Sequence, residues 1–267
     1  MPNFELSPQL SLHYIENNPS GHRPVILLHG LGANCSSWQL QIPALVEEDF
    51  RVIAPDVRGF GQSTYPGGKT SIHAMAEDME KLLASLQIGQ TDVIGISMGG
   101  TIALQLAIAH PELVRKLVLV NTFAHLRPDS LSGWFYFVIR LVIIQILGLR
   151  AQAKVVSKRL FPQLEQEELR RLLIIQIMEA DPHGYRAAMH ALWNFDVTDR
   201  LGSLTMPTLV ITGDADTTVP LRIQQRLAGS IPNARQVLIH QAGHAVTVEK
   251  PTEFNQALML FLNPPPS

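Results

Sequence analysis

A serine between two glycines stands at the end of an apolar run, in the segment "GISMG" that spans residues 95–99. The run before it is typical of a buried strand, and the alanine-rich run after it is typical of a helix. A serine in G-x-S-x-G at such a junction is held out on a sharp turn, where the glycines let strand and helix approach closely. The helix directs the positive end of its dipole at the serine oxygen, which stabilises negative charge formed by attack on a carbonyl. We therefore predict that Ser97 is a nucleophile.

A serine hydroxyl is a weak nucleophile near neutral pH, so a neighbouring base has to take its proton. His244 is the candidate, because it lies in "AGHAV", after the last predicted strand. Most of the other histidines fall in predicted helices, in the middle of the chain or near the N-terminus. The rival, His240, falls inside the predicted strand, so we expect its side chain to pack against a face of the sheet.

Two aspartates follow the predicted strand "PTLVIT" and are candidates for the acid that orients the histidine. A buried carboxylate beside the imidazole fixes its tautomer and stabilises the imidazolium. Asp216 lies further beyond the strand and is favoured. Asp214 directly follows Gly213 and could instead serve the turn, and it stays open as the alternative.

The oxyanion formed on attack needs hydrogen-bond donors, which we expect to be backbone amides. One is the amide of Met98, the residue after the nucleophile, and the other is the amide of Leu31 in the loop after "VILLHG". Gly30 and Gly32 let that loop curl, so that its amide can point inward.

The elements that must position these residues are short apolar runs separated by helical segments. Six runs lack alternation, as expected for strands buried on both faces: "PVILLHG", "RVIAPD", "DVIGIS", "KLVLVNT", "PTLVITGD" and "RQVLIHQAGH". Helical periodicity covers residues 36–48, 72–86, 98–110 and 221–229. This order predicts a parallel sheet of βαβ units, with an antiparallel edge hairpin from "FEL" and "QLSLHYIEN". Sites form beyond the carboxyl ends of parallel strands, where the serine, aspartate and histidine all fall.

The alternation of strands and helices stops between Thr122 and Arg200, in a segment that is predicted to form about four helices. We expect a core of residues 1–122 and 199–267, and a helical cap of residues 123–198 over the carboxyl edge of the sheet. Apolar aromatic side chains are expected to line a pocket between the two: Trp134, Phe135, Phe137, Trp193 and Phe195.

The bulk composition narrows the function classes. The chain has 267 residues with a net charge of −2, which gives no electrostatic reason to expect a nucleic-acid partner. The one cysteine, Cys35, excludes an internal disulfide framework and is expected to be a small buried residue. The N-terminal residues are unlike a signal peptide, so a cytoplasmic protein is expected. The sequence carries no signal for the oligomeric state.

Weaker motifs predict no cofactor and no metal. "PGGKTS" lacks the earlier glycine of a phosphate-binding loop and is interpreted as a helix N-cap at Thr70 or Ser71. His183 and His190 have no neighbouring residues to complete a metal site. The apolar run 134–149 is shorter than the roughly 20 residues that span a membrane and is expected to be a cap helix. A helix that lies on a lipid surface stays open for this run.

Five motifs in order resemble the α/β-hydrolase superfamily: "HGLGANCSSW", "VIAPDVRGFGQS", "GISMGG", "GDADTTVP" and "AGHAVTVEKP". The resemblance covers nearly the whole chain outside the insertion. It implies a mostly parallel eight-stranded sheet with helices on both faces and a cap inserted after the sixth strand. It also implies the roles given above for Ser97, Asp216 and His244, and for the amides of Leu31 and Met98.

Among the branches of that superfamily, the chain is similar to capped carboxylesterases and enol-lactonase-like proteins. Ser97 disfavours the aspartate-nucleophile dehalogenases and epoxide hydrolases, Ala245 counts against the carbon–carbon bond hydrolases, and Met98 against the proline iminopeptidases. We expect a cofactor-independent serine hydrolase of small to medium apolar carboxylic esters. The alternatives are a lactonase or carbon–carbon bond hydrolase with the same triad, and a slow-turnover ligand-sensing or partner-binding protein.

Overall fold

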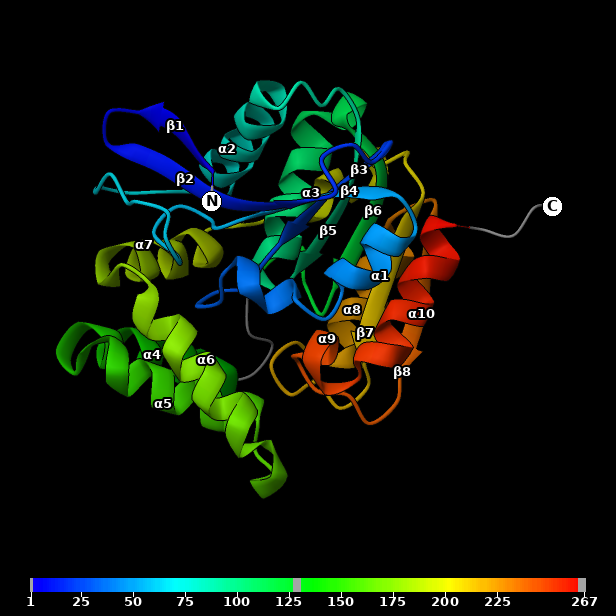
Figure 1. Ribbon diagram of the computed structural model, residues 1–267. Helices are drawn as coiled ribbons and strands as arrows, with labels where there is room; N and C mark the ends of the chain where they lie inside the picture. The colour runs from blue at the N-terminus through cyan, green and yellow to red at the C-terminus, as the bar shows by residue number, and fades with distance from the viewer. Residues whose placement is uncertain (1, 127–130, 264–267) are drawn as a thin grey trace.

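One twisted sheet of eight strands runs through the molecule, in the order β1-β2-β4-β3-β5-β6-β7-β8 (Figure 1). The computed structural model describes residues 2–126 and 131–263, of which 131–134, 136 and 137 by backbone alone. The strands are β1 (Asn3–Ser7), β2 (Leu10–Asn17), β3 (Arg23–Leu28), β4 (Phe50–Pro55), β5 (Thr91–Ile96), β6 (Val114–Val120), β7 (Thr208–Gly213) and β8 (Ala234–Ile239).

The sheet has the predicted mixture of directions. β1 and β2 form an antiparallel hairpin, β2 runs antiparallel to β4, and every other neighbouring pair is parallel. Residues of β3 alternate between two buried layers, with Ile26 and Leu28 in one and Val25 and Leu27 in the other. Because both faces are covered, such a strand needs apolar residues at every position, which explains the runs without alternation.

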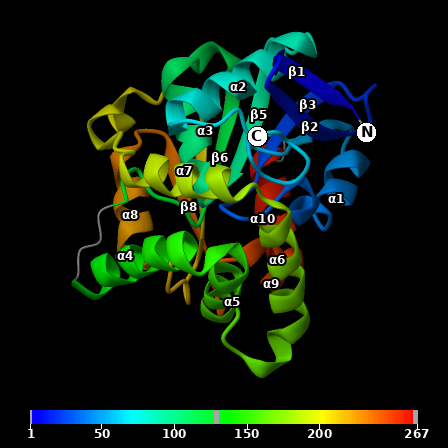
Figure 2. The ribbon, with the colours of Figure 1, turned by 90° about the vertical axis from the view of Figure 1, so that its left-hand side faces the viewer.

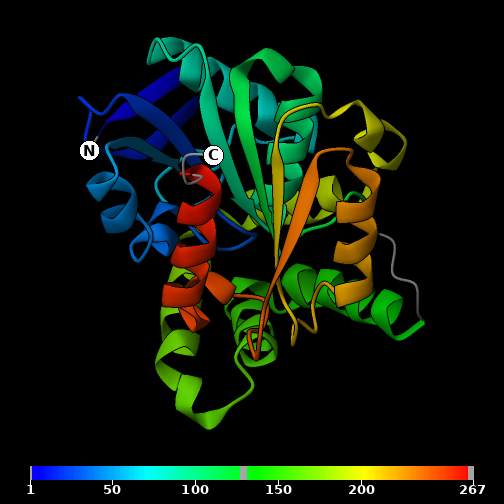
Figure 3. The same ribbon diagram turned by 90° about the vertical axis from the view of Figure 1, so that its right-hand side faces the viewer.

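Helices cover both faces of the sheet (Figures 1 and 3). One face carries α2 (Ile72–Ser85), α3 (Met98–Ala109) and α8 (Leu221–Ser230), and the other carries α1 (Ile42–Glu47), the short α9 (Val246–Glu249) and α10 (Pro251–Leu262). The expected N-cap of α2 is confirmed at Ser71, whose hydroxyl accepts from the amide of Ala74 at 3.0 Å. The helix expected over 36–48 is divided into a 3-10 turn (Cys35–Trp38) and α1, because Pro43 cannot occupy a helix interior.

Four helices occupy the segment between β6 and β7, as predicted. They are α4 (Leu131–Ile146), α5 (Gly148–Leu160), α6 (Glu167–Glu179) and α7 (Pro182–Trp193). They lie beyond the carboxyl ends of the parallel strands (Figures 1 and 2). α7 holds the insertion against the loop after β4, because the amide of Asp181 donates to the carbonyl oxygen of Gly59 at 2.9 Å.

The chain enters and leaves this insertion through a narrow neck. The amide of Val197 donates to the carbonyl oxygen of Ala124 at 3.0 Å. His125 and Asp196 form an antiparallel bridge beside them. None of the described helices combines the length and the apolar character that are needed to cross a membrane.

Candidate active site

Ser97 lies on a strained turn between β5 and α3, with φ +53° and ψ −115°. Few non-glycine residues adopt a positive φ, so neighbouring contacts have to hold this conformation. The amide of Ser97 donates to the carbonyl oxygen of Val120 at 2.9 Å, and its own carbonyl accepts from the Thr122 hydroxyl at 2.7 Å. Hydrogen bonds at both the amide and the carbonyl of Ser97 therefore hold the turn against the end of β6.

The glycines around Ser97 are required by close packing. A Cβ atom on Gly95 would lie 2.2 Å from the carbonyl oxygen of Gly99. A Cβ atom on Gly99 would lie 2.0 Å from the carbonyl oxygen of Leu28 in β3. Real Cβ atoms do not come this close, so a larger residue at either position would push the strand and helix apart.

His244 and Asp216, two of the predicted site residues, form a buried pair. The distance between His244 Nδ1 and Asp216 Oδ2 is 2.8 Å, and the aspartate side chain is 0% exposed. The other oxygen, Oδ1, accepts from the amides of Thr218 at 2.7 Å and Val219 at 3.0 Å. Because Oδ2 is the acceptor that faces the ring, the proton of a neutral His244 belongs on Nδ1, and Nε2 is left as a base.

The alternative acid, Asp214, is engaged elsewhere. Its carboxylate accepts from His240 Nδ1 at 2.8 Å and from the amide of Gln241 at 2.7 Å. The hydrogen bond from His240 lowers the pKa of Asp214. The expectation that His240 packs on a sheet face was wrong, because β8 ends at Ile239 and the His240 side chain is 82% exposed in the following turn. Asp214 thus serves the turn.

Asn121 joins the turn of Ser97 to the loop of His244, and sequence reasoning missed it. Its amide nitrogen donates to the carbonyl oxygens of Gly243 at 2.9 Å and His244 at 2.8 Å. Its side-chain oxygen accepts from the amide of Gly213 at 2.9 Å. Asn121 directly follows Val120, to which Ser97 is bonded, so both loops are anchored at one point of the sheet edge. The one signal in the sequence was a polar residue directly after an apolar strand.

In the described part of the chain, no hydrogen bond joins the Ser97 hydroxyl to the His244 ring. Ser97 is half-buried and His244 is 9% exposed. Hydrogen bonds between catalytic groups are often long without substrate and shorten in the complex. The shared anchor at Asn121 places the two groups at one edge of the sheet without a direct bond.

The loop after β3 presents the amide of Leu31. Buried His29 accepts at Nε2 from the amide of Val57 at 2.9 Å, so its proton lies on Nδ1, which donates to the carbonyl oxygen of Gly30 at 2.8 Å. That carbonyl shares a trans peptide with the Leu31 N–H, which therefore points the opposite way. A Cβ atom on Gly30 would lie 3.5 Å from Ser97 Cβ, so the loop adjoins the serine. Burial lowers the pKa of His29, which keeps the ring neutral.

A second carboxylate, Glu249, holds the loop of His244, and sequence reasoning missed this residue too. Its Oε2 accepts from the amide of Gly243 and its Oε1 from the amide of Ala245, both at 3.0 Å. These two amides flank His244, so Glu249 holds the loop by one hydrogen bond on each side of the histidine. Burial raises the pKa of Glu249, and the two amides partly oppose that rise.

The predicted aromatic pocket is only partly tested. Phe135 is 55% exposed, which corrects its assignment to an enclosed pocket, and Phe195 is buried in the main apolar core. Trp193 is partly buried against the same core. The side chains of Trp134 and Phe137 lie outside the described residues. A hollow of about 440 Å³ between β8 and α10 includes none of Ser97, Asp216 and His244 in its lining, so it does not replace this pocket.

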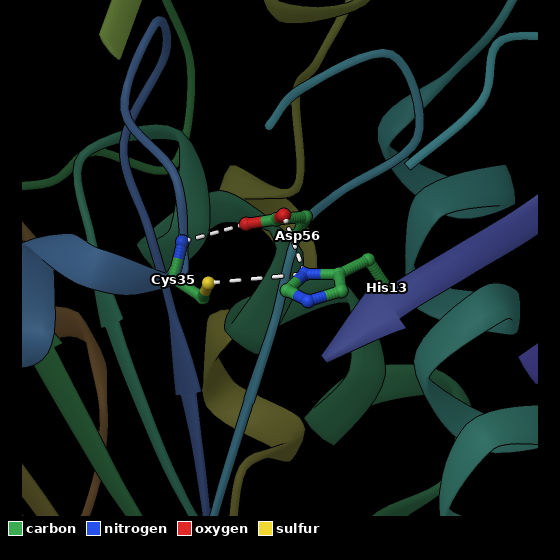
Figure 4. A group of neighbouring side chains, drawn as sticks. All are labelled: His13, Cys35 and Asp56. Atoms are coloured by element: carbon green, nitrogen blue, oxygen red, sulfur yellow. Dashed lines mark hydrogen bonds and ion pairs between the residues drawn. The ribbon is translucent and has the colours of Figure 1, made fainter. Parts of the chain in front are cut away.

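One buried cluster has the residue types of a metal site. Ligand atoms of His13, Cys35 and Asp56 lie within 4.8 Å of one another (Figure 4). The Asp56 carboxylate already accepts from His13 Nδ1 at 2.8 Å and from the amides of Cys35 at 2.7 Å and Gln62 at 2.9 Å. Burial and Asp56 raise the pKa of the Cys35 thiol, so it stays protonated. We interpret the cluster as a clasp, a set of hydrogen bonds that ties β2 to the loops after β3 and β4.

Comparison with known proteins identifies the class. The chain matches the sequence profile of the alpha/beta hydrolase fold over residues 23–251, and it therefore belongs to the α/β-hydrolase family. Its sheet has the eight strands and the mostly parallel order that the sequence predicted.

Individual relatives and solved structures show which hydrolases the chain is similar to. A protein of Variovorax paradoxus named "Putative carbamate hydrolase RutD" is 33% identical over 261 residues, which cover 95% of this chain and 96% of the relative. The enol-lactonase of Burkholderia xenovorans has a similar structure, with a TM-score of 0.89 and 27% identity over 98% of this chain and 99% of that one. A thermophilic esterase of Thermogutta terrifontis gives a TM-score of 0.84 and 29% identity over 97% and 96% of the two chains. The chain is thus similar to hydrolases that are named for different substrates: carbamates, enol-lactones and esters.

Proposed function

We propose that this α/β hydrolase is a carboxylesterase that acts on small to medium apolar esters through Ser97, His244 and Asp216. The observation that carries the proposal is the buried 2.8 Å hydrogen bond between His244 and Asp216, at the sheet edge where Ser97 is held on its strained turn. That bond leaves His244 Nε2 as the base, which serine chemistry requires.

In the first half of the proposed reaction, Ser97 Oγ attacks the ester carbonyl carbon while His244 Nε2 takes its proton. The amides of Leu31 and Met98 stabilise the negative oxygen, and the amide of Met98 is free for this because the first amides of a helix have no intrahelical acceptor. The tetrahedral intermediate then expels the alcohol, which takes the proton from His244. The acyl group stays on Ser97.

In the second half, water attacks the acyl carbon and gives its proton to His244. The intermediate releases the carboxylic acid, and the proton returns to Ser97 Oγ. Asp216 stays ionised throughout and stabilises the imidazolium in both halves. The sum is ester plus water to acid plus alcohol, with no cofactor.

We also propose the division into a core of residues 1–122 and 199–267 and a cap of residues 123–198. Support comes from Gly32, beside the oxyanion amide of Leu31. A Cβ atom on Gly32 would lie 2.8 Å from the Ile177 side chain and 3.1 Å from the Tyr185 ring, both in the insertion. The insertion thus lies against the oxyanion loop, where it can shape the substrate pocket.

A series of p-nitrophenyl esters, from acetate to decanoate, tests the proposal together with labelling by a fluorophosphonate probe. Wild-type protein should turn over the shorter esters and take the label on Ser97, as located by mass spectrometry. Ser97→Ala should lose both. Rapid labelling without turnover would favour the ligand-sensing alternative, and a wild type that neither labels nor turns over would refute the proposal.

Carbamate hydrolysis is a second candidate, favoured by the name of the relatives that align with over nine tenths of the chain, such as the one from Variovorax paradoxus. A carbamate has the same carbonyl carbon for Ser97 to attack, with nitrogen in place of the carbon atom that is attached to it in an ester. Adding a carbamate and a lactone to the ester series, with ammonia release as a readout for the former, compares the three classes. The highest kcat/KM that is lost in Ser97→Ala decides among them.

A further inference from the structure

Helix α4 exposes a row of large apolar side chains, which we call the α4 stripe. It consists of Phe135, Ile139, Val142 and Ile146, which are 55%, 50%, 48% and 73% exposed. Their spacing of four, three and four residues puts them on one face of the helix. Ile144, on the opposite face, is buried in the main core, so α4 packs on the molecule through a face other than the stripe.

Single exposed apolar residues are ordinary on protein surfaces, but a continuous row marks a surface that is covered by something else. Leu147, directly after the helix, is also an exposed apolar side chain, at 66%. Figures 1 and 2 show α4 and α5 at the end of the molecule that lies beyond the strands. The stripe is therefore on a surface that a large partner can reach.

The charge of the adjoining helix α5 indicates what kind of surface covers the α4 stripe. Residues 131–160 contain five basic residues and no acidic residue, whereas the whole chain has a net charge of −2. Two of the five are engaged internally, because Arg140 donates to the Tyr185 hydroxyl and Arg159 to the carbonyl oxygen of Thr217, both at 2.9 Å.

The other three basic residues, Arg150, Lys154 and Lys158, are exposed at four-residue spacing on α5. Within the described ranges, the charged group of none of the three makes a hydrogen bond or ion pair. They form a row of cations on the helix that packs against α4. An apolar stripe beside unpaired cations has the composition of helices that lie in a membrane interface.

We propose that the α4 stripe and the α5 cations dock this protein on an anionic lipid surface. The stripe enters the boundary between headgroups and acyl chains, and Arg150, Lys154 and Lys158 lie near the lipid phosphates. A second copy is a poorer partner, because pairing two stripes would bring two basic segments together. The proposal does not depend on the hydrolytic function.

Cosedimentation with vesicles tests the docking. The probes are vesicles of pure phosphatidylcholine and of phosphatidylcholine with phosphatidylglycerol, at low and high salt. We expect binding to the anionic vesicles that weakens at high salt and on pure phosphatidylcholine. Ile139→Ser with Ile146→Ser, and separately Lys154→Glu with Lys158→Glu, should each lower the binding constant by about tenfold.

Matched controls lie elsewhere on the surface. Leu238→Ser with Leu260→Ser removes two other exposed apolar side chains, and Lys69→Glu with Lys81→Glu reverses two other exposed lysines. Both controls should bind as wild type does. Three results would overturn the proposal: no binding of the wild type to anionic vesicles, equal losses in test and control variants, or a stripe-dependent dimer in sedimentation velocity without lipid.

Discussion

Replacing Glu249 by glutamine tests whether the two hydrogen bonds from the loop of His244 to this carboxylate matter for catalysis. Each oxygen of Glu249 accepts one amide at 3.0 Å, from Gly243 and from Ala245. Glutamine has the same shape but one oxygen, so one amide would face an NH₂ group instead of an acceptor. A hydrogen bond to a charged group contributes about 1.5–3 kcal/mol.

Part of that loss is recovered, because burial already disfavours the charge of Glu249, as its raised pKa shows. We therefore take the lower end of the range, about 1.5 kcal/mol, which corresponds to a fall of about tenfold in kcat/KM for Glu249→Gln. The assay is ester hydrolysis across a pH series, with Glu253→Gln, an exposed glutamate on α10, as a control that should leave kcat/KM unchanged.

The pH dependence of kcat/KM tests whether the charge of Glu249 is responsible for the effect. As the pH falls through the raised pKa of Glu249, the wild type takes a proton on that carboxyl and loses one acceptor, as the variant has already done. The ratio of wild-type to variant kcat/KM should therefore shrink toward acid pH. A variant within twofold of wild type across the whole pH series would refute the proposed role of these hydrogen bonds.

Three further predictions concern other groups of the site. Asp216→Asn should lower kcat by about 10³–10⁴-fold in the ester assay, because the histidine loses its tautomer, whereas Asp214→Asn should stay within a few-fold of wild type; the reverse order would make Asp214 the acid. The Cys35 thiol, whose pKa is raised by burial, should resist a maleimide in the native state and react in denaturant, and rapid native labelling would contradict the buried clasp. Because burial lowers the pKa of His29, the native state leaves it neutral while the unfolded chain takes a proton below about pH 6.5. The free energy of unfolding should thus decrease as the pH is lowered below about 6.5, by up to about 1.4 kcal/mol per pH unit from this group. Urea titrations of wild type and His29→Gln at several pH values should show a shallower dependence of that free energy on pH in the variant.

The catalytic candidates were predictable because each follows an apolar run within about five residues. Ser97, Asp216 and His244 lie beyond the ends of β5, β7 and β8, and the sheet brings those ends together. His240 was misplaced because the end of β8 depends on a turn held by the Asp214 carboxylate, and that contact has no local pattern.

The supporting residues were not predictable for a related reason. Asn121 acts on loops that are far away in the sequence, and Glu249 acts through a bend that only the folded chain has. The apolar composition of residues 134–149 predicted a cap helix, but not which of its faces is covered. Phe135 was therefore assigned to a pocket although it lies on the surface.

The neck of the insertion has a consequence for how this enzyme can change. The chain leaves β6 and returns to β7, two neighbouring strands, and Ala124 and Val197 close the gap with one hydrogen bond. Whatever lies between them can lengthen, shorten or be exchanged without shifting the register of any strand. If the insertion shapes the substrate pocket as proposed, a new substrate preference can thus be acquired by replacing one continuous stretch of the gene, while Ser97, Asp216 and His244 outside it keep their places.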